Sequence, residues 1–253
     1  MPIRTGIDQH IAEVVLDHPP VNALDSAGWN ELAQVITRAG SDPEAHVVLI
    51  RSEGKGFCAG VDLKEMHAFP DRIVALNRGN YLTFKAVRAC EVPVVTAVQG
   101  FVIGGGIGIC GASDVIIASD DAYFSLPEID RGAMGGAAHL SRMLPLHKVR
   151  AAFFTGARVP AEEAWRLGAI EKIVLRESLV EEARAFAAII ASKSRTALRL
   201  AKEALNGIEA IDVDRAYRFE QGFTLEMYMH EDSRRARASF VERKGKADFQ
   251  EPI

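Results

Sequence analysis

A glutamate that could move protons follows the apolar run Ala122–Leu126. Glu128 stands directly after Pro127 and is followed by Asp130 and Arg131. A carboxylate in this place can cap a helix or pair with Arg131. Apolar neighbours would instead favour its protonated form and suit it to proton transfer. The residues alone leave both interpretations open.

A run rich in glycine, Gly104–Gly111, could bring backbone N–H groups close to a ligand oxygen. Its last six residues match the GxGxxG pattern of dinucleotide-binding folds. That interpretation, a nicotinamide oxidoreductase, requires a helix directly afterwards, whereas a strand-like run begins at Asp114. Two other interpretations are a turn that permits close packing and a helix that begins near Gly104. Such a helix would direct its free N–H groups at a substrate oxygen.

A second segment of small residues, Gly56–Met66, follows the continuous apolar run Val47–Ile50. The apolar run predicts a buried strand. The small residues after it would let the backbone approach a ligand closely. Taken alone, the segment is equally consistent with an ordinary strand-to-helix turn.

The wider pattern predicts an α/β protein with a helical C-terminal part. Apolar runs and alternation predict strands over residues 10–16, 47–50, 93–98, 114–118, 122–126 and 170–174. Amphipathic spacing predicts helices over 27–39 (capped by Asp25 or Ser26), 77–88, 161–167 (ended by Gly168), 179–193, 194–207 and 212–230. We expect an α/β core over 1–195 and a helical region over 196–253 whose apolar faces serve subunit contacts.

Composition narrows the function classes. The net charge is −4, so a nucleic-acid partner is not expected. Three cysteines without CxxC spacing and seven histidines without paired spacing predict no metal site. The N-terminus lacks the pattern of a signal peptide, and no apolar run is long enough to span a membrane. We therefore expect a cytoplasmic protein without membrane contact.

Together these segments resemble the crotonase superfamily, the enoyl-CoA hydratase/isomerase family. The resemblance spans nearly the whole chain and is carried by residues 20–24 (PVNAL), 57–66, 98–101 leading into 104–106, 122–132, 154–156 with Ala164 and Gly168, and 240–244 (FVERK). It implies a spiral of ββα units followed by a helical trimerisation region. It also implies an acyl-CoA substrate, a homotrimer or dimer of trimers, and no cofactor besides the coenzyme A of the substrate.

The resemblance assigns roles to individual residues. The backbone N–H groups of Val61 and Gly105 would form an oxyanion hole for the thioester oxygen, and Glu128 would be the acid–base residue. Charge on that oxygen makes the α-carbon acidic and the β-carbon electrophilic, so one hole can serve several reactions. Coenzyme A would lie against Ala59, Asp62, Leu63, Lys64 and, near the C-terminus, Lys244. Met66, Gly108 and Gly132 would line the acyl pocket.

One feature of the hydratases is missing. They hold a water between two glutamates, and the position of the second is Gly108 here. Candidate replacements are Asp130, which would share a face with Glu128 only if 128–130 is extended, and His139. A single glutamate suits double-bond isomerisation or C–C hydrolysis, and the lost carboxylate would enlarge the pocket for a bulky substrate.

A subgroup resemblance points to a particular bulky substrate. Residues 130–135, 138–142, 201–206 and 217–224 are similar to the ring-opening acyl-CoA hydrolases of bacterial steroid catabolism. Those enzymes cleave a C–C bond in a cyclic β-oxo acyl-CoA. Hydration, isomerisation and C–C hydrolysis stay open at this point, and so does a non-catalytic member of the fold that binds CoA or RNA.

Overall fold

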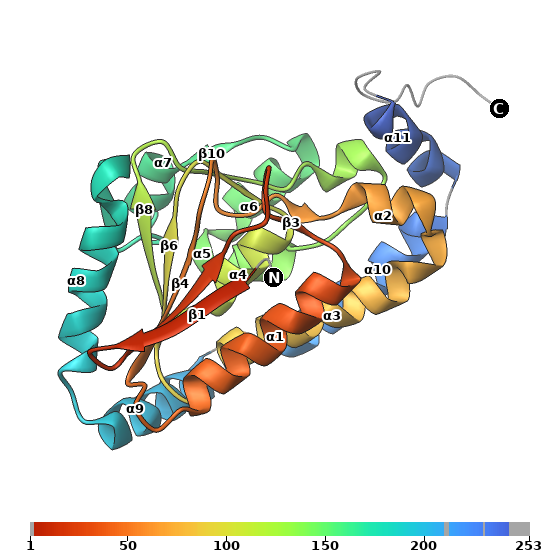
Figure 1. Ribbon diagram of the computed structural model, residues 1–253. Coiled ribbons are helices and arrows are strands. Elements are labelled where there is room, and N and C mark those ends of the chain that lie inside the picture. Colours follow the sequence, from red (N-terminus) through yellow and green to blue (C-terminus); the bar gives the residue numbers. More distant parts are fainter. Residues whose placement is uncertain (1–2, 210–212, 230, 243–253) are drawn as a thin grey trace.

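The computed structural model describes residues 3–209, 213–229 and 231–242 (Figure 1). Its centre is a six-stranded sheet in the order β1-β2-β4-β6-β8-β11. β1 (Ile3–Asp8) and β2 (Ile11–Leu16) form an antiparallel hairpin. From β2 onward neighbouring strands are parallel: β4 (Val47–Ser52), β6 (Val94–Val98), β8 (Val115–Ser119) and β11 (Lys172–Val174).

The sheet is buried on both faces, which explains the unbroken apolar runs of its strands. On one face Val47, Leu49, Val95 and Ala97 pack against α8 (Leu179–Ala191), which stands alone on that side in Figure 1. The alternate residues, including Val48, Ile50 and Val98, face the main core. Since side chains alternate across a strand, each apolar run supplies both layers.

The expected spiral of ββα units is confirmed. Four strands of the large sheet, β2, β4, β6 and β8, are each followed by a short strand in a second layer and then by helical structure. The short strands that follow them are β3 (Ala23–Leu24), β5 (Gly60–Val61), β7 (Phe101–Ile103) and β9 (Tyr123–Ser125), and a fifth short strand, β10 (Val159–Pro160), pairs with β9. β3 pairs with β5, β7 pairs with β9, and a single bridge between Cys58 and Val102 links the two small sheets.

The helices that follow the short strands cover the main core. They are α1 (Ser26–Ser41), α2 (Leu63–Ala68), η1 (Pro70–Arg72), α3 (Ile73–Arg88), α4 (Gly105–Ala112), η2 (Pro127–Arg131), α5 (Ala137–Met143), α6 (Leu146–Thr155), α7 (Ala161–Arg166) and η3 (Arg176–Ser178). The Asp25 side chain caps α1 by accepting a 2.7 Å hydrogen bond from the Gly28 N–H. Gly104 immediately precedes α4, so the helix lies inside the glycine run and leaves no place for a dinucleotide-type crossover.

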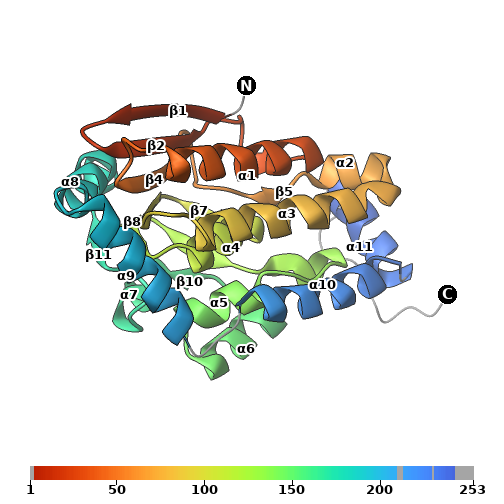
Figure 2. The ribbon, with the colours of Figure 1, turned by 90° about the horizontal axis from the view of Figure 1, so that it is seen from below.

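The C-terminal helices close over this core. They are α9 (Arg195–Ile208), α10 (Val213–Met229) and α11 (Glu231–Val241). Figure 2 shows α1, α3 and α10 running side by side, and α10 contacts both α3 and α5. The buried Lys202 pins α9 by donating to Asp114 at 2.7 Å and to the Val87 carbonyl at 3.2 Å. A domain division near residue 195 stays a prediction.

Most predicted elements are present with ends displaced by a few residues. The strand β1 and the helices α2, α5, α6 and α11 were not predicted, since they are short or polar. No helix in the described part of the chain has the length and apolarity needed to cross a membrane.

Candidate active site

A cavity that is open to solvent lies where the second layer meets α3, α10 and α11. The wall combines backbone from β5 and the α4 start with side chains from distant segments. They include Met66, Leu76, Asn77, Asn80, Phe84, Glu128, Arg131, Tyr217, Thr224, Tyr228 and Arg237.

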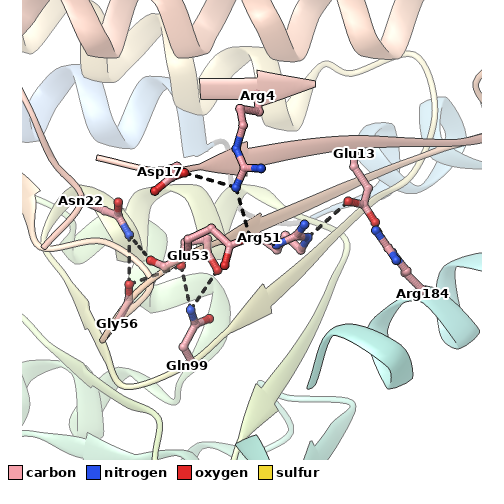
Figure 3. A network of polar contacts seen from close by, with 10 residues as sticks. Arg4, Glu13, Asp17, Asn22, Arg51, Glu53, Gly56, Gln99 and Arg184 are labelled. Atoms are coloured by element: carbon pink, nitrogen blue, oxygen red, sulfur yellow. Dashed lines mark hydrogen bonds and ion pairs between the residues drawn. The ribbon is translucent and has the colours of Figure 1, made fainter. Parts of the chain in front are cut away.

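The segment before β5 is held by two buried amides, Asn22 and Gln99 (Figure 3). Asn22, with a positive φ of 53°, donates to the carbonyls of Glu53 at 2.9 Å and Gly56 at 3.1 Å. Gln99 donates to the Ser52 carbonyl at 3.0 Å. Buried amides with complete partners specify one loop conformation. These contacts give a structural reason for Asn22 in the PVNAL segment and fix the approach to the cavity.

Charged side chains extend the same support to the sheet. Arg51 lies between Glu53, at 2.8 Å, and Glu13, at 3.2 Å, and Arg184 from α8 also pairs with Glu13 (Figure 3). These cations lower the pKa of Glu13 against the opposing effect of burial, which is the largest single influence. These ion pairs join β2, β4 and α8, so the loop that leaves β4 starts from a strand whose position is fixed.

Val61, the last residue of β5, lines the cavity. β5 pairs in parallel with β3, and Asp62 N–H donates to the Leu24 carbonyl at 2.9 Å. Successive N–H groups of a strand point to opposite edges, so the Val61 N–H faces away from β3. That edge lies against the start of α4: a β-carbon placed on Gly60 would be 3.2 Å from Gly105 N.

The second predicted donor, Gly105, is the first residue of α4. N–H groups in the first turn of a helix have no intrahelical acceptor and carry the positive end of the helix dipole. Gly104 before it has φ 53° and ψ −111°, a conformation open to glycine. The arrangement is therefore suited to holding an oxygen that gains negative charge. Its catalytic use stays a prediction.

Glu128 lies in η2 and lines the cavity. Its Oε1 packs on Gly104, where an added β-carbon would be only 2.4 Å away. Asp130 does not line the cavity, because the segment is helical and directs the two carboxylates apart. Asp130 Oδ2 instead faces Gly156. The suggestion that Asp130 shares the site with Glu128 is therefore wrong.

Arg131 brings a cation to the same wall as Glu128. Burial lowers its pKa, and the charges of Glu128 and Asp130 oppose that shift. A guanidinium whose pKa is lowered in this way is still charged near neutral pH. The wall thus carries the Glu128 carboxyl group and the charged guanidinium of Arg131, with Arg237 from α11 as a further cation.

His139 does not reach the cavity wall. It is 1% exposed and packs edge-on against Phe84 and Tyr217, with ring centroids 4.7 and 5.1 Å away. Burial, reinforced by the charge of Arg142, lowers its pKa to about 3. A ring that stays neutral and enclosed cannot exchange protons with substrate near neutral pH. The suggestion that His139 replaces the second glutamate is wrong.

The structure also corrects the two glycines placed in the acyl pocket. Neither is part of the cavity wall. A β-carbon on Gly108 would lie 2.2 Å from the Phe84 ring, so Phe84 fills the space of the missing carboxylate and the pocket is not enlarged there. Gly132, with φ 68°, packs against Ser233 of α11. Met66 does line the cavity.

The proposed coenzyme A contacts divide in the same way. Ala59 and Leu63 line the cavity. Asp62 caps α2 by accepting from the Lys64 N–H at 2.8 Å, and Lys64 itself is exposed. Lys244 lies outside the described residues. No group of three or more His, Cys, Asp or Glu side chains in the described ranges is placed to hold a metal ion.

The wall formed by α3, α10 and α11 was not predicted from the sequence. Asn77, Asn80, Tyr217, Thr224, Tyr228 and Arg237 all face the cavity. They are spread between positions 77 and 237 of the chain, and no short motif links them. The polar positions within the apolar stripe of 77–88 were the available signal, because Asn77 and Asn80 interrupt a helix face that is otherwise buried.

Comparison with known proteins agrees with the fold. The family model described as enoyl-CoA hydratase/isomerase matches residues 6–252. The chain belongs to the enoyl-CoA hydratase/isomerase family. It is accordingly an enzyme of the crotonase superfamily that acts on acyl-CoA thioesters.

Two curated relatives of this crotonase-family enzyme carry the same name, (7aS)-7a-methyl-1,5-dioxo-2,3,5,6,7,7a-hexahydro-1H-indene-carboxyl-CoA hydrolase. The one from Rhodococcus jostii is 50% identical over 92% of this chain and 91% of the relative. The one from Mycobacterium tuberculosis is 46% identical over 96% of this chain and 100% of the relative. A solved enoyl-CoA hydratase from Mycobacterium avium subsp. paratuberculosis superposes with a TM-score of 0.88 at 24% identity, covering 99% of each chain, and shows the shared fold.

The contact between Gly108 and Phe84 can be tested by stability measurements. Gly108→Ala should lower the free energy of unfolding by ~1–3 kcal/mol, because the methyl group overlaps the ring. An unhindered helix position would instead gain up to ~1 kcal/mol from the same change. In a Phe84→Ala background the loss should largely disappear. Urea unfolding of the wild type, the two single variants and the double variant gives the coupling energy. Additive effects would show that the two residues do not share this space.

The buried His139 should make stability fall in mild acid. Its pKa is about 3 in the folded protein, against about 6.5 unfolded, so the unfolded state binds more protons between these values. The neutral ring's contribution is complete above pH ~6.5 and declines as pH falls toward ~3. Between pH ~7 and ~5.5 the protein should lose about 1 kcal/mol more unfolding free energy than His139→Gln. Equal losses in urea titrations of both proteins would contradict this.

Proposed function

We propose that this enzyme hydrolyses a ring C–C bond in a cyclic β-oxo acyl-CoA, of the dioxo-indene-carboxyl-CoA type named for its relatives. The observation that carries the proposal is the filling of the Gly108 site by Phe84. A second carboxylate for the two-glutamate hydration of a double bond has no space there. The names of the 50% and 46% identical relatives support the same reaction.

The proposed reaction uses the groups that face the cavity. Water adds to the ring carbon that bears the β-oxo group, and Glu128 takes a proton from that water. The bond from that carbon to the α-carbon breaks, and its electron pair moves through the α-carbon onto the thioester oxygen. Val61 and Gly105 N–H groups stabilise this oxyanion, each by ~3 kcal/mol. Glu128 then returns the proton to the α-carbon, so a carboxylic acid and an opened acyl-CoA result.

Coenzyme A would enter along the β5–α2 segment. Ala59 and Leu63 would contact the thioester arm, since both line the cavity. Asp62, Lys64 and Lys244 stay candidates for contacts with the nucleotide part. No cofactor is needed, because water is the only other reactant.

We further propose a cytoplasmic homotrimer or dimer of trimers. Large apolar side chains stay exposed on the helices that follow the core: Ile189 at 62%, Leu200 at 61% and Leu205 at 62%. Exposed apolar faces of this kind commonly become subunit contacts.

Light scattering on the protein as it elutes from a size-exclusion column measures the mass of the assembly. The mass should be three or six times the 27.5 kDa of one chain. Leu205→Glu should reduce it by placing a charge in the subunit contact. A monomer mass for the wild type would contradict the proposal.

The role of Glu128 is tested by an amide substitution. Glu128→Gln should lower kcat for ring opening by ~10²–10⁴-fold, because the side chain keeps its shape but cannot accept a proton. Asp130→Asn is the matched control and should keep wild-type turnover, since Asp130 does not line the cavity. Release of the ring-opened acyl-CoA, followed by mass spectrometry, is the measurement. Wild-type kcat in Glu128→Gln would exclude it as the base, and CoA-thioester binding without turnover by the wild type would exclude the reaction.

A further inference from the structure

Two asparagines of α3 present their side chains to the cavity from one helix face. Asn77 and Asn80 are three residues apart, so they lie on neighbouring turns with Leu76 and Phe84. Only 8% of Asn77 and 6% of Asn80 is exposed. From the opposite side, Gln221 of α10 donates to the Asn77 carbonyl at 2.6 Å and fixes this turn.

Each amide carries a buried atom whose bonding capacity is unused. Within the described ranges, Asn77 Nδ2 and Asn80 Oδ1 have no hydrogen-bond partner. Most buried polar groups of native proteins are bonded, and an exception needs an explanation. The nearby Asn30 Nδ2, by contrast, donates to the Ser26 carbonyl at 2.7 Å. One unused donor and one unused acceptor therefore belong to side chains that line the same cavity, and a polar ligand would satisfy both.

The unused acceptor lies beside the predicted oxyanion hole. A β-carbon on Gly105 would be 3.6 Å from Asn80 Oδ1, and one on Gly104 would be 2.4 Å from Glu128 Oε1. The amide and the carboxylate thus approach two consecutive residues at the start of α4. A neutral amide oxygen can accept a hydrogen bond from water but cannot take its proton.

We propose that Asn80 Oδ1 holds the attacking water and that Asn77 Nδ2 donates to the ring oxo oxygen under attack. This inference rests on the proposed ring-opening function and names the groups that recognise its substrate. The water gives its proton to Glu128 while its oxygen bonds to the oxo carbon. Asn77 stabilises the charge that develops on the oxo oxygen. Asn80 therefore supplies, from α3, the water contact that the residue at position 108 does not provide.

The test uses two probes and three variants. The probes are a CoA thioester of cyclohexanone with its carboxyl group next to the oxo carbon, and the same thioester without the oxo group. The variants are Asn77→Leu and Asn80→Leu, which keep size but remove the polar atoms, and Asn30→Leu as the control outside the cavity. Calorimetry gives Kd for both probes, turnover gives kcat and KM, and thermal unfolding gives Tm.

Asn77→Leu should weaken binding of the oxo probe at least tenfold and leave Kd for the probe without the oxo group unchanged. Asn80→Leu should lower kcat at least tenfold with KM nearly constant. The variant loses the contact with the attacking water and keeps the contacts with the substrate. Both should keep or raise Tm, since an unused buried polar atom is removed. Asn30→Leu should keep kcat and KM and lower Tm, because a formed hydrogen bond is lost.

The inference is overturned if Asn77→Leu weakens both probes equally, or if Asn80→Leu changes KM and kcat only in proportion to a lowered Tm. Failure of the proposed function and failure of this inference give different results. If the wild type opens no oxo ring, the proposed function fails, whereas the difference in Kd between the probes still decides the role of Asn77.

Discussion

The close approach of two backbone segments is the constraint on which the site depends. β5 and the start of α4 come so near that a β-carbon on Gly60 would lie 3.1 Å from the Ile103 carbonyl and 3.2 Å from Gly105 N. Glycine at this point allows the N–H edge of a strand and the N-terminus of a helix to face one cavity. Any side chain there would force the two segments apart.

The surroundings of this contact serve to keep it in place. Asn22 and Gln99 hold the loop before β5 through hydrogen bonds to its carbonyls. Arg142 donates to the Gly111 carbonyl at the C-terminal end of α4. A cation at a helix C-terminus interacts favourably with the negative end of the helix dipole. The short α4 is thus supported at its end, and its free N–H groups can face the cavity without a capping side chain.

The missing second carboxylate has a packing consequence as well as a chemical one. Phe84 occupies its place and stands edge-on to Trp29, His139 and Tyr217, with ring centroids 4.7 to 5.9 Å apart. Aromatic edges and faces attract in such arrangements. The cluster makes this side of the site apolar and rigid, and it leaves the polar work to Glu128, the backbone donors and the amides of α3.

The sequence by itself determined the layers, the order of the main strands and helices, and the family. Buried strands and amphipathic helices leave a local periodicity, and the glycines of a close approach cannot be replaced without strain, so both are readable along the chain. The family resemblance, and not the periodicity, assigned Val61, Gly105, Glu128 and Met66 to the site, and all four line the cavity. Only the tertiary structure decided which side chains meet there. Whether a side chain reaches the cavity depends on elements far away in sequence, such as Phe84 against Gly108, the helical turn that separates Asp130 from Glu128, and the aromatic shell around His139.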